Sequence, residues 1–204
     1  MSSKSYWDLF YKKQKIKSFE WLVDNSCLEQ LLPQINKSNT IAFLLDVGCG
    51  SSLFSSQLKE SLPEPAMLLC ADFSFDALLR LKSSTSAVAI DFIQCDCKRL
   101  PFRSSLFDLA IDKGYLDSVL KQLTLVSANK AMSETLESMS TILEKLDENK
   151  LLIQITDEQP ELRISLLDEF HFGNSSFEIN YSFKEIHVNE SIYFAYFINK
   201  TKKC

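Results

Sequence analysis

Short, continuously apolar runs alternate along the chain with segments in which apolar residues recur at helical spacing. Seven runs have the length of a strand: Ile41–Val47, Met67–Ala71, Phe92–Gln94, Phe107–Ile111, Leu151–Ile155, Phe183–Val188 and Ile192–Asn199. The first five are apolar nearly throughout, which is typical of parallel strands that are covered by helices on both faces. The pattern therefore predicts an α/β fold with a parallel sheet.

The last two runs are connected differently from the others. Only Asn189, Glu190 and Ser191 separate them, and three residues are too few for a crossover connection. These two strands must therefore pair as an antiparallel hairpin. The expected sheet has seven strands, five parallel ones followed by a C-terminal antiparallel hairpin, with helices on both faces.

Two of the connecting segments carry clear helix signals. Ser74 is a candidate N-cap before Leu78, Leu79 and Leu81, and Asp76 in the first turn suits the helix dipole. In a later segment, five apolar residues recur at intervals of four and three: Met132, Leu136, Met139, Leu143 and Leu146. We expect both segments to be helices that pack on the core.

An aromatic segment of about forty residues precedes the first predicted strand. It holds both tryptophans of the chain, Trp7 within Tyr6–Tyr11 and Trp21 within Phe19–Trp21. The segment is either an amphipathic helix packed on the domain or a lid whose aromatic side chains touch a bound cofactor. The expected division is a helical aromatic lid at residues 1–40 and a single α/β domain at residues 41–204.

The overall charge and composition exclude several classes of function. Lys and Arg total 22 against 27 Asp and Glu, and the formal net charge of −5 provides no strong general attraction to nucleic acid or to an anionic membrane. No apolar run reaches 18 residues, and Lys4, Asp8 and Lys12 interrupt the N-terminus, so we expect neither a membrane span nor secretion. The six cysteines form no CxxC pair and the two histidines have no metal-ligand spacing, so we expect reduced intracellular thiols and no metal.

A glycine loop follows the first predicted strand. Gly48 and Gly50 are two of only four glycines, and their lack of a Cβ atom lets a ligand approach the backbone closely. A dinucleotide fingerprint would need a third glycine where Leu53 stands, and the lysine of a phosphate-binding P-loop is absent. The loop therefore argues against a nicotinamide-dependent oxidoreductase.

Three acidic residues stand at the ends of successive predicted strands: Asp46, Asp72 and Asp96. A carboxylate at the end of the second strand accepts hydrogen bonds from a ribose diol. Acids around the loop would repel a pyrophosphate, but they suit S-adenosylmethionine, which carries an ammonium and a sulfonium and no phosphate. The sequence therefore predicts S-adenosylmethionine as the cofactor.

Two sets of motifs resemble a known family. The first resembles the seven-strand class I methyltransferases, which have a Rossmann-like sheet: Leu45–Ser52, Asp72–Ser74, Asp96 and Phe107–Gly114. The second narrows the resemblance to the lysine methyltransferases that act on citrate synthase and on elongation factor 1-alpha: Tyr6–Asp8 with Tyr11, Phe19–Trp21 and Asp112–Asp117. The C-terminal segments Leu152–Arg163 and Tyr193–Phe197 look most like the mitochondrial enzymes that act on citrate synthase.

The resemblance implies a protein-lysine methyltransferase with a folded protein substrate, citrate synthase first and elongation factor 1-alpha second. It implies a mitochondrial location, although no Arg-rich and Ser-rich transit peptide precedes Tyr6, which leaves a cytoplasmic location open. A small-molecule methyltransferase and a non-enzymatic partner subunit with the same fold are the alternatives.

The matching motifs also assign roles to individual residues. Those expected to bind the cofactor are Trp7, Tyr11 and Trp21 as its cover, Gly48 and Gly50 in the loop, Asp72 at the ribose, Phe73, Asp96 and Cys97 around the adenine, and Lys113 at the methionine carboxylate. Asp112 is a candidate to orient the substrate ammonium and accept its proton through water, and Tyr115 to hold the amine by a cation–π contact. Asp112 could equally cap the following turn, and Lys113 could be a solvated loop residue.

Overall fold

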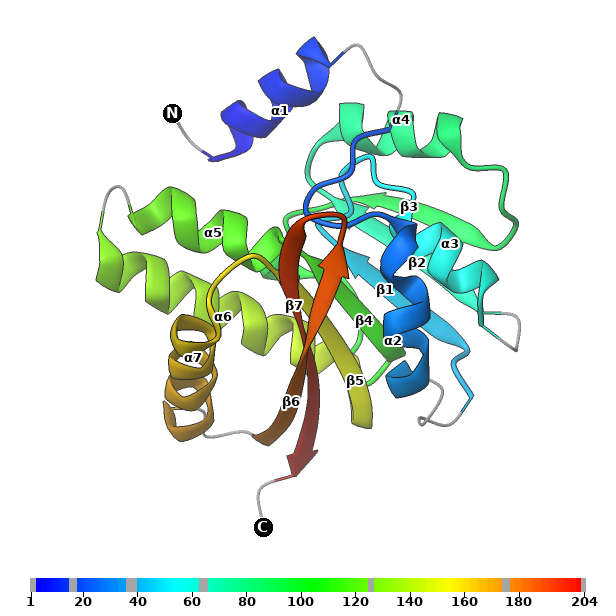
Figure 1. The fold of residues 1–204 in the computed structure, drawn as a ribbon. Coiled ribbons are helices and arrows are strands. Elements are labelled where there is room, and N and C mark those ends of the chain that lie inside the picture. The colour runs from blue at the N-terminus through cyan, green and yellow to red at the C-terminus, as the bar shows by residue number, and fades with distance from the viewer. Residues whose placement is uncertain are drawn as a thin grey trace.

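A single mixed sheet forms the centre of the molecule. The computed structural model describes residues 3–14, 18–35, 40–62, 66–124, 127–173 and 177–202. The sheet has seven strands in the order β3-β2-β1-β4-β5-β7-β6 (Figure 1). The strands are β1 Phe43–Val47, β2 Met67–Asp72, β3 Ile90–Gln94, β4 Phe107–Lys113, β5 Leu146–Thr156, β6 Phe177–Val188 and β7 Ser191–Lys202.

The pairing directions confirm the predicted fold class. Strands β1 to β5 pair in parallel, whereas β7 pairs antiparallel with both β5 and β6. The hairpin turns tightly between Val188 and Ser191, which face each other, and Asn189 adopts a positive φ of 53° in the turn. Its strands are longer than the apolar runs that predicted them.

Helices cover both faces of the sheet, except the first, which lies at the edge formed by the strand ends (Figure 1). They are α1 Ser3–Lys13, α2 Leu28–Ile35, α3 Phe54–Glu60, α4 Phe75–Ser84, α5 Tyr115–Thr124, α6 Ala128–Lys145 and α7 Pro160–Gly173, with 3₁₀ turns at Asn25–Cys27 and Cys97–Arg99. Neighbouring strand residues alternate between two cores, so that Leu44 packs with α2, α3 and α4 while Leu45 packs with α5, α6 and α7. No helix in the described part of the chain is both long and apolar enough to cross a bilayer.

The predicted helix signals are confirmed with two adjustments. The Ser74 side chain caps α4 by accepting a hydrogen bond from the Ala77 amide at 3.4 Å, but Leu79 is 48% exposed and does not join the buried face of the helix. The apolar stripe of α6 ends at Leu143, because Leu146 is already the first residue of β5, where it is buried.

The carboxyl ends of the parallel strands meet at one edge of the sheet, and the N-terminal segment crosses this edge. In Figure 1, α1 lies above the edge beside α4, and the chain then runs over the strand ends to α2. The Arg80 side chain on α4 donates a hydrogen bond of 2.8 Å to the Gln14 carbonyl just after α1. The aromatic residues near the N-terminus are therefore placed over the glycine loop, although α2 itself is part of the core.

Candidate functional site

The glycine loop is held by hydrogen bonds to the end of β2. Gly48 and Gly50 have positive φ angles of 63° and 57°, a conformation that glycine adopts without steric cost. The amides of Gly48 and Cys49 both donate to the Ala71 carbonyl, at 2.8 and 3.1 Å. The Gly50 amide donates to Asp72 Oδ2 at 2.9 Å. Asp72 therefore shapes the loop as well as facing the site.

Three glycines at this edge make room for aromatic rings. A Cβ atom would collide with an aromatic side chain at each of them: with Tyr115 at Gly48, with Tyr11 at Gly50 and with Trp21 at Gly114. All three also have positive φ, so a larger residue would be strained as well as crowded. Gly50 and Gly114 thus let the aromatic segment approach the strand ends, and Gly48 does the same for Tyr115 on α5.

A cavity lies between the aromatic segment and the strand ends. Its lining residues come from α1, the segment before α2, the ends of the first strands and the first turns of α5: Trp7, Tyr11, Phe19, Trp21, Gly48, Asp72, Phe73, Cys97, Lys113, Gly114, Tyr115 and Ser118. Trp7 packs edge-on against Trp21 with ring centroids 5.8 Å apart and stacks on Tyr11 at 6.0 Å. Most of the predicted cofactor residues are therefore brought together.

The free volume of this cavity is about 60 Å³, which is room for only a few water molecules. The cavity is partly open to solvent, so a nucleoside-sized ligand would extend beyond this volume toward the cavity mouth. The rings contributed by α1 pack on the neighbouring aromatic segment, Trp7 on Trp21 and Phe10 on Phe19, while the helix itself lies beside α4. A smaller adjoining cavity, which Gly50, Asp46 and Ser52 help to line, extends the same site along the glycine loop.

The three strand-end acids have different surroundings. Asp72 is 6% exposed and accepts hydrogen bonds from the amides of Gly50 and Ser74, and burial raises its pKa to about 6. Burial raises the pKa of Asp46 to about 7. Asp96 is exposed and caps the following 3₁₀ turn by accepting from the Lys98 amide at 3.0 Å. The structure therefore places Asp72 in the main cavity and Asp46 in the adjoining one, and Asp96 in neither.

Asp112 lies below the cavity and does not line it. It is completely buried, and its Oδ1 accepts from the amides of Tyr115 and Leu116 at 2.7 and 3.2 Å while its Oδ2 accepts from Gln154 Nε2 at 2.9 Å. Burial raises its pKa to about 6. These contacts make Asp112 the cap of α5, which was the alternative to a role at the substrate amine. The expected catalytic position is not observed, because both oxygens point into the protein.

Tyr115 does line the cavity, together with Tyr11. Burial raises the pKa of both phenols, so both stay neutral at physiological pH. The Tyr115 side chain packs directly on Gly48, where a Cβ atom would come within 2.8 Å of it. A neutral ring in this place can attract a cationic group by its face.

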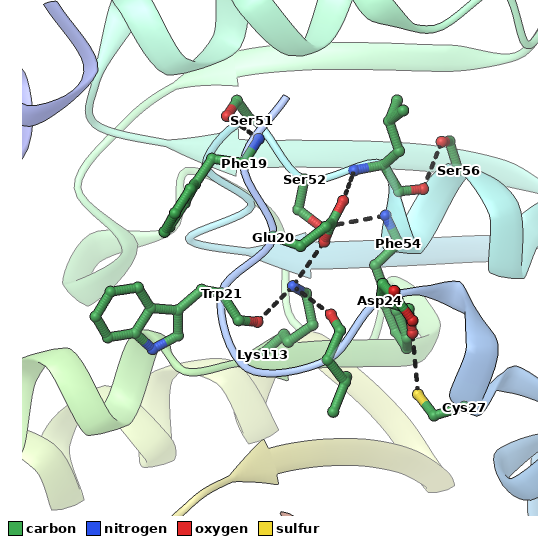
Figure 2. Close-up of polar contacts among 12 residues, drawn as sticks. Phe19, Glu20, Trp21, Asp24, Cys27, Ser51, Ser52, Phe54, Ser56 and Lys113 are labelled. Carbon is green, nitrogen blue, oxygen red and sulfur yellow. Dashed lines mark hydrogen bonds and ion pairs between the residues drawn. The ribbon is translucent and has the colours of Figure 1, made fainter. Parts of the chain in front are cut away.

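Lys113 borders the cavity, but its ammonium points toward the N-terminal segment (Figure 2). Its Nζ donates to Glu20 Oε2 at 3.0 Å and to the carbonyls of Trp21 and Val23 at 2.7 and 3.1 Å. An ammonium has three protons, and all three are used by these acceptors. Its side chain is 6% exposed, so Lys113 is neither the solvated residue that was one alternative nor free to bind a carboxylate in this arrangement.

Four residues of the site escaped the sequence analysis: Phe19, Glu20, Gly114 and Ser118. Phe19 and Glu20 stand beside Trp21 in a motif that was noted, and Gly114 follows Lys113 directly. Ser118 lies one turn after Tyr115 on α5, and this spacing puts both on the cavity side of the helix. Among the described residues, no group of three or more His, Cys, Asp or Glu side chains is placed to hold a metal ion.

Comparison with known proteins identifies the family. A family model described as a methyltransferase domain matches residues 44–145, half of the chain, from β1 to the end of α6. The chain belongs to this methyltransferase family. The predicted fold and the predicted cofactor, S-adenosylmethionine, are thereby confirmed.

Individual relatives resemble this methyltransferase over different lengths. The mitochondrial citrate synthase-lysine N-methyltransferase of Danio rerio is 26% identical over 82% of this chain and 72% of its own. The eEF1A lysine and N-terminal methyltransferase of Danio rerio is 27% identical over 65% of this chain but only 19% of its own. The crystal structure of the N-methyltransferase NodS of Bradyrhizobium japonicum, with S-adenosyl-L-homocysteine, has a TM-score of 0.67, 17% identity and coverage of 98% of this chain and 99% of that chain.

Proposed function

We propose that this S-adenosylmethionine-dependent methyltransferase methylates the side-chain amine of a lysine in a folded protein, with citrate synthase as the first candidate. One observation carries the proposal. The similarity to the citrate synthase-lysine N-methyltransferase of Danio rerio extends over 82% of this chain, whereas the general methyltransferase-domain family model ends at residue 145. The similarity therefore includes regions outside the common cofactor domain, where partner choice is expected to reside.

The chemistry of the lining residues fits the proposed cofactor. Asp72, with its raised pKa and its place at the end of β2, is the group we assign to the ribose diol. Phe73 and Cys97 are apolar surfaces for the adenine, and Gly48 leaves the backbone open toward the methionine part. Asp96 stays our proposed contact at the adenine edge, although it does not line the cavity: its Oδ1 accepts from the Lys98 amide, which leaves Oδ2 for the ligand.

S-adenosylmethionine supplies an electrophilic methyl group on its sulfonium. The protein must bring the amine into line with that group, and alignment of this kind can be worth effective molarities of ~10⁵–10⁸ M. The walls that can provide it are the rings of Trp7, Trp21, Tyr11 and Tyr115. These rings also shield the amine from part of the surrounding solvent.

The substrate lysine must lose its proton before it can act as a nucleophile. At pH 7 this costs roughly 4–5 kcal/mol for a lysine with a free pKa of ~10.4. An aromatic cavity lowers this cost, because removal from water disfavours the ammonium relative to the neutral amine. Among the described residues, the carboxylate that lines this cavity is Asp72, which we assign to the ribose. We therefore assign deprotonation of the amine to desolvation and to solvent at the cavity mouth.

A protein substrate also agrees with the charge of the molecule. The net charge of −5 favours approach of a basic, lysine-bearing surface. The relative from Danio rerio is described as mitochondrial, and we propose the same compartment for this protein. A cytoplasmic location is the alternative that would accompany the second candidate substrate.

Elongation factor 1-alpha is that second candidate. The supporting observation is the 27% identity to an eEF1A lysine and N-terminal methyltransferase, which covers 65% of this chain. This chain matches only 19% of that larger protein, so the similarity concerns about one fifth of its length. A small-molecule methyltransferase and a partner subunit without activity remain the alternatives.

Incubation of the purified protein with S-adenosylmethionine and each of the two candidate substrates tests the proposal. Mass spectrometry of peptides should find methyl-lysine in citrate synthase. Modification of the elongation factor alone would replace the first candidate by the second. Modification of neither protein, together with turnover of a small amine or acid, would contradict the assignment to protein lysine.

A further inference from the structure

A pair of charged residues, Glu20 and Lys113, connects the segment of residues 19–23, which we name the strap, to the domain. Glu20 and Lys113 lie 93 residues apart in sequence, and Lys113 Nζ and Glu20 Oε2 are 3.0 Å apart (Figure 2). The Lys113 side chain is 6% exposed and that of Glu20 28%. A charge buried to this degree is stable only with hydrogen-bonded partners, so the pair is a specific contact.

Glu20 connects the strap to the residues that follow the glycine loop. Its Oε2 accepts from Ser52 Oγ at 2.5 Å, and its Oε1 accepts from the Leu53 amide at 2.8 Å. The Phe19 amide adds a hydrogen bond of 3.1 Å to Ser51 Oγ. One carboxylate thus joins three partners from two elements, the loop and the end of β4.

Lys113 fixes the turn of the strap from the other side. It binds the carbonyls of Trp21 and Val23, and the residue between them, Leu22, has a φ of 67°. Such a conformation is rare for leucine and persists only where the surroundings enforce it. The ammonium also lies 5.6 Å from the centre of the Phe54 ring, on the first residue of α3.

The position of Trp21 depends on this arrangement. Its ring packs against Gly114, where a Cβ atom would come within 2.8 Å of Trp21 Cδ1, and it contacts Trp7 on α1. Because the Trp21 carbonyl is one of the three acceptors of Lys113, the backbone that carries this ring is anchored by the pair.

We propose that Glu20 and Lys113 are a positioning pair that holds the strap on the glycine loop. Cofactor affinity depends on this pair because it places the aromatic wall of the cavity, which consists of Trp7, Tyr11 and Trp21. The inference rests on the proposed location of the cofactor. It replaces the expectation that Lys113 binds the methionine carboxylate, and the two ideas make different predictions.

Two ligands distinguish a positioning role of Lys113 from direct binding of the methionine carboxylate. S-adenosylhomocysteine carries the amino-acid carboxylate, whereas 5′-methylthioadenosine lacks it. Lys113→Met should weaken binding of both ligands by about the same factor, tenfold or more, since charged hydrogen bonds of this type are lost. Glu20→Gln should weaken both ligands by a smaller common factor, because Lys113 keeps its hydrogen bonds to the carbonyls of Trp21 and Val23. The double variant should lose less than the product of the two factors.

Tryptophan fluorescence of the ligand-free protein reports on the position of the strap independently of ligand affinity. Both tryptophans of the chain, Trp7 and Trp21, are in the aromatic wall. In both variants we expect the emission to shift to longer wavelength and to become more accessible to quenching by acrylamide. Lys150→Met is the matched control, because Lys150 forms a partly buried ion pair of 2.8 Å with Asp108 near the opposite end of β4. This control should change neither emission nor affinity.

Two results would overturn the proposal. In the first, Lys113→Met weakens only S-adenosylhomocysteine and leaves the emission unchanged, which would make Lys113 a carboxylate ligand. In the second, both variants bind and fluoresce like the wild type. Circular dichroism and thermal unfolding identify a variant that has failed to fold. If Lys113→Met does not fold, the binding and emission of Glu20→Gln, the milder change, test the proposal. If the wild-type protein bound neither ligand, the cofactor site would be wrong, whereas the emission data would still report on the strap.

Discussion

At the scale of single residues, the glycines show how tightly the site is built. Gly114 has a φ of 89° and the Trp21 ring over its Cα atom. Both the backbone conformation and the close approach of the ring therefore require a glycine here. Gly173, at the end of α7, has no atom within 4 Å of the place a Cβ would take. The two glycines therefore form a natural pair for comparison.

We predict that Gly114→Ala lowers the free energy of unfolding by about 1–3 kcal/mol and weakens cofactor binding, because the backbone is strained and Trp21 is displaced. Gly173→Ala should leave both quantities unchanged or make the protein slightly more stable. Urea unfolding and calorimetric titration measure the two effects. Equal behaviour of the two variants would show that the ring over Gly114 is not held in place.

A second residue-scale prediction concerns pH. Burial raises the pKa of Asp46 from 3.8 to about 7, so the native state binds a proton that the unfolded state has lost over this range. Stability contributed by the neutral form is present below pH 4 and is lost as the pH rises through 7. We therefore expect Asp46→Asn to become more stable relative to the wild type as the pH is raised from 4 to 8. A stability difference that is constant or falls with pH would contradict the assignment.

At the scale of elements, the first turn of α5 is the best supported part of the site. Asp112 caps it, Gln154 on β5 holds Asp112, and Asp117 forms a buried ion pair with Arg163 on α7. The cavity side of the same turn carries Tyr115 and Ser118. The polar groups beneath the helix thus set the position of the side chains above it.

We predict that Asp112→Asn keeps the stability and most of the turnover of the enzyme. The asparagine oxygen can still cap α5, and its amide can donate to Gln154 Oε1, a buried atom without a hydrogen-bond partner among the described residues. Asp112→Ala should lower the free energy of unfolding by about 1–3 kcal/mol, because the cap is lost. A stable Asp112→Asn variant without turnover would instead assign the carboxylate a direct role in the reaction.

Some elements of the fold and the site could be predicted from the sequence, and others could not. The buried parallel strands were predictable, because strands covered on both faces must be apolar throughout. The first half of β6 was not, because this edge strand is exposed at most of its positions and forms no apolar run. The glycine loop and Asp72 were predictable from their place after strands. The contact between Glu20 and Lys113 was not, because no local pattern connects residues on distant segments.

At the scale of the whole molecule, the N-terminal segment forms part of the cavity wall and also covers the strand ends. The aromatic rings line a cavity of about 60 Å³ that is partly open to solvent. The strap is fixed through Lys113 and the glycine loop, whereas α1 rests on α4. We therefore expect any movement on cofactor binding to occur in α1, whereas the strap keeps its position.

The central claim is that this cavity binds S-adenosylmethionine through Asp72, and calorimetric titration with S-adenosylhomocysteine tests it most directly. The wild-type protein should bind this ligand and should not bind a nicotinamide dinucleotide. Asp72→Ala should weaken binding about ten- to a hundredfold, because a charged hydrogen bond to the ribose, worth ~1.5–3 kcal/mol, is lost. Asp91→Ala, at an exposed position of β3, is the control. Unchanged affinity in a folded Asp72→Ala variant, or binding of the dinucleotide alone, would contradict the account.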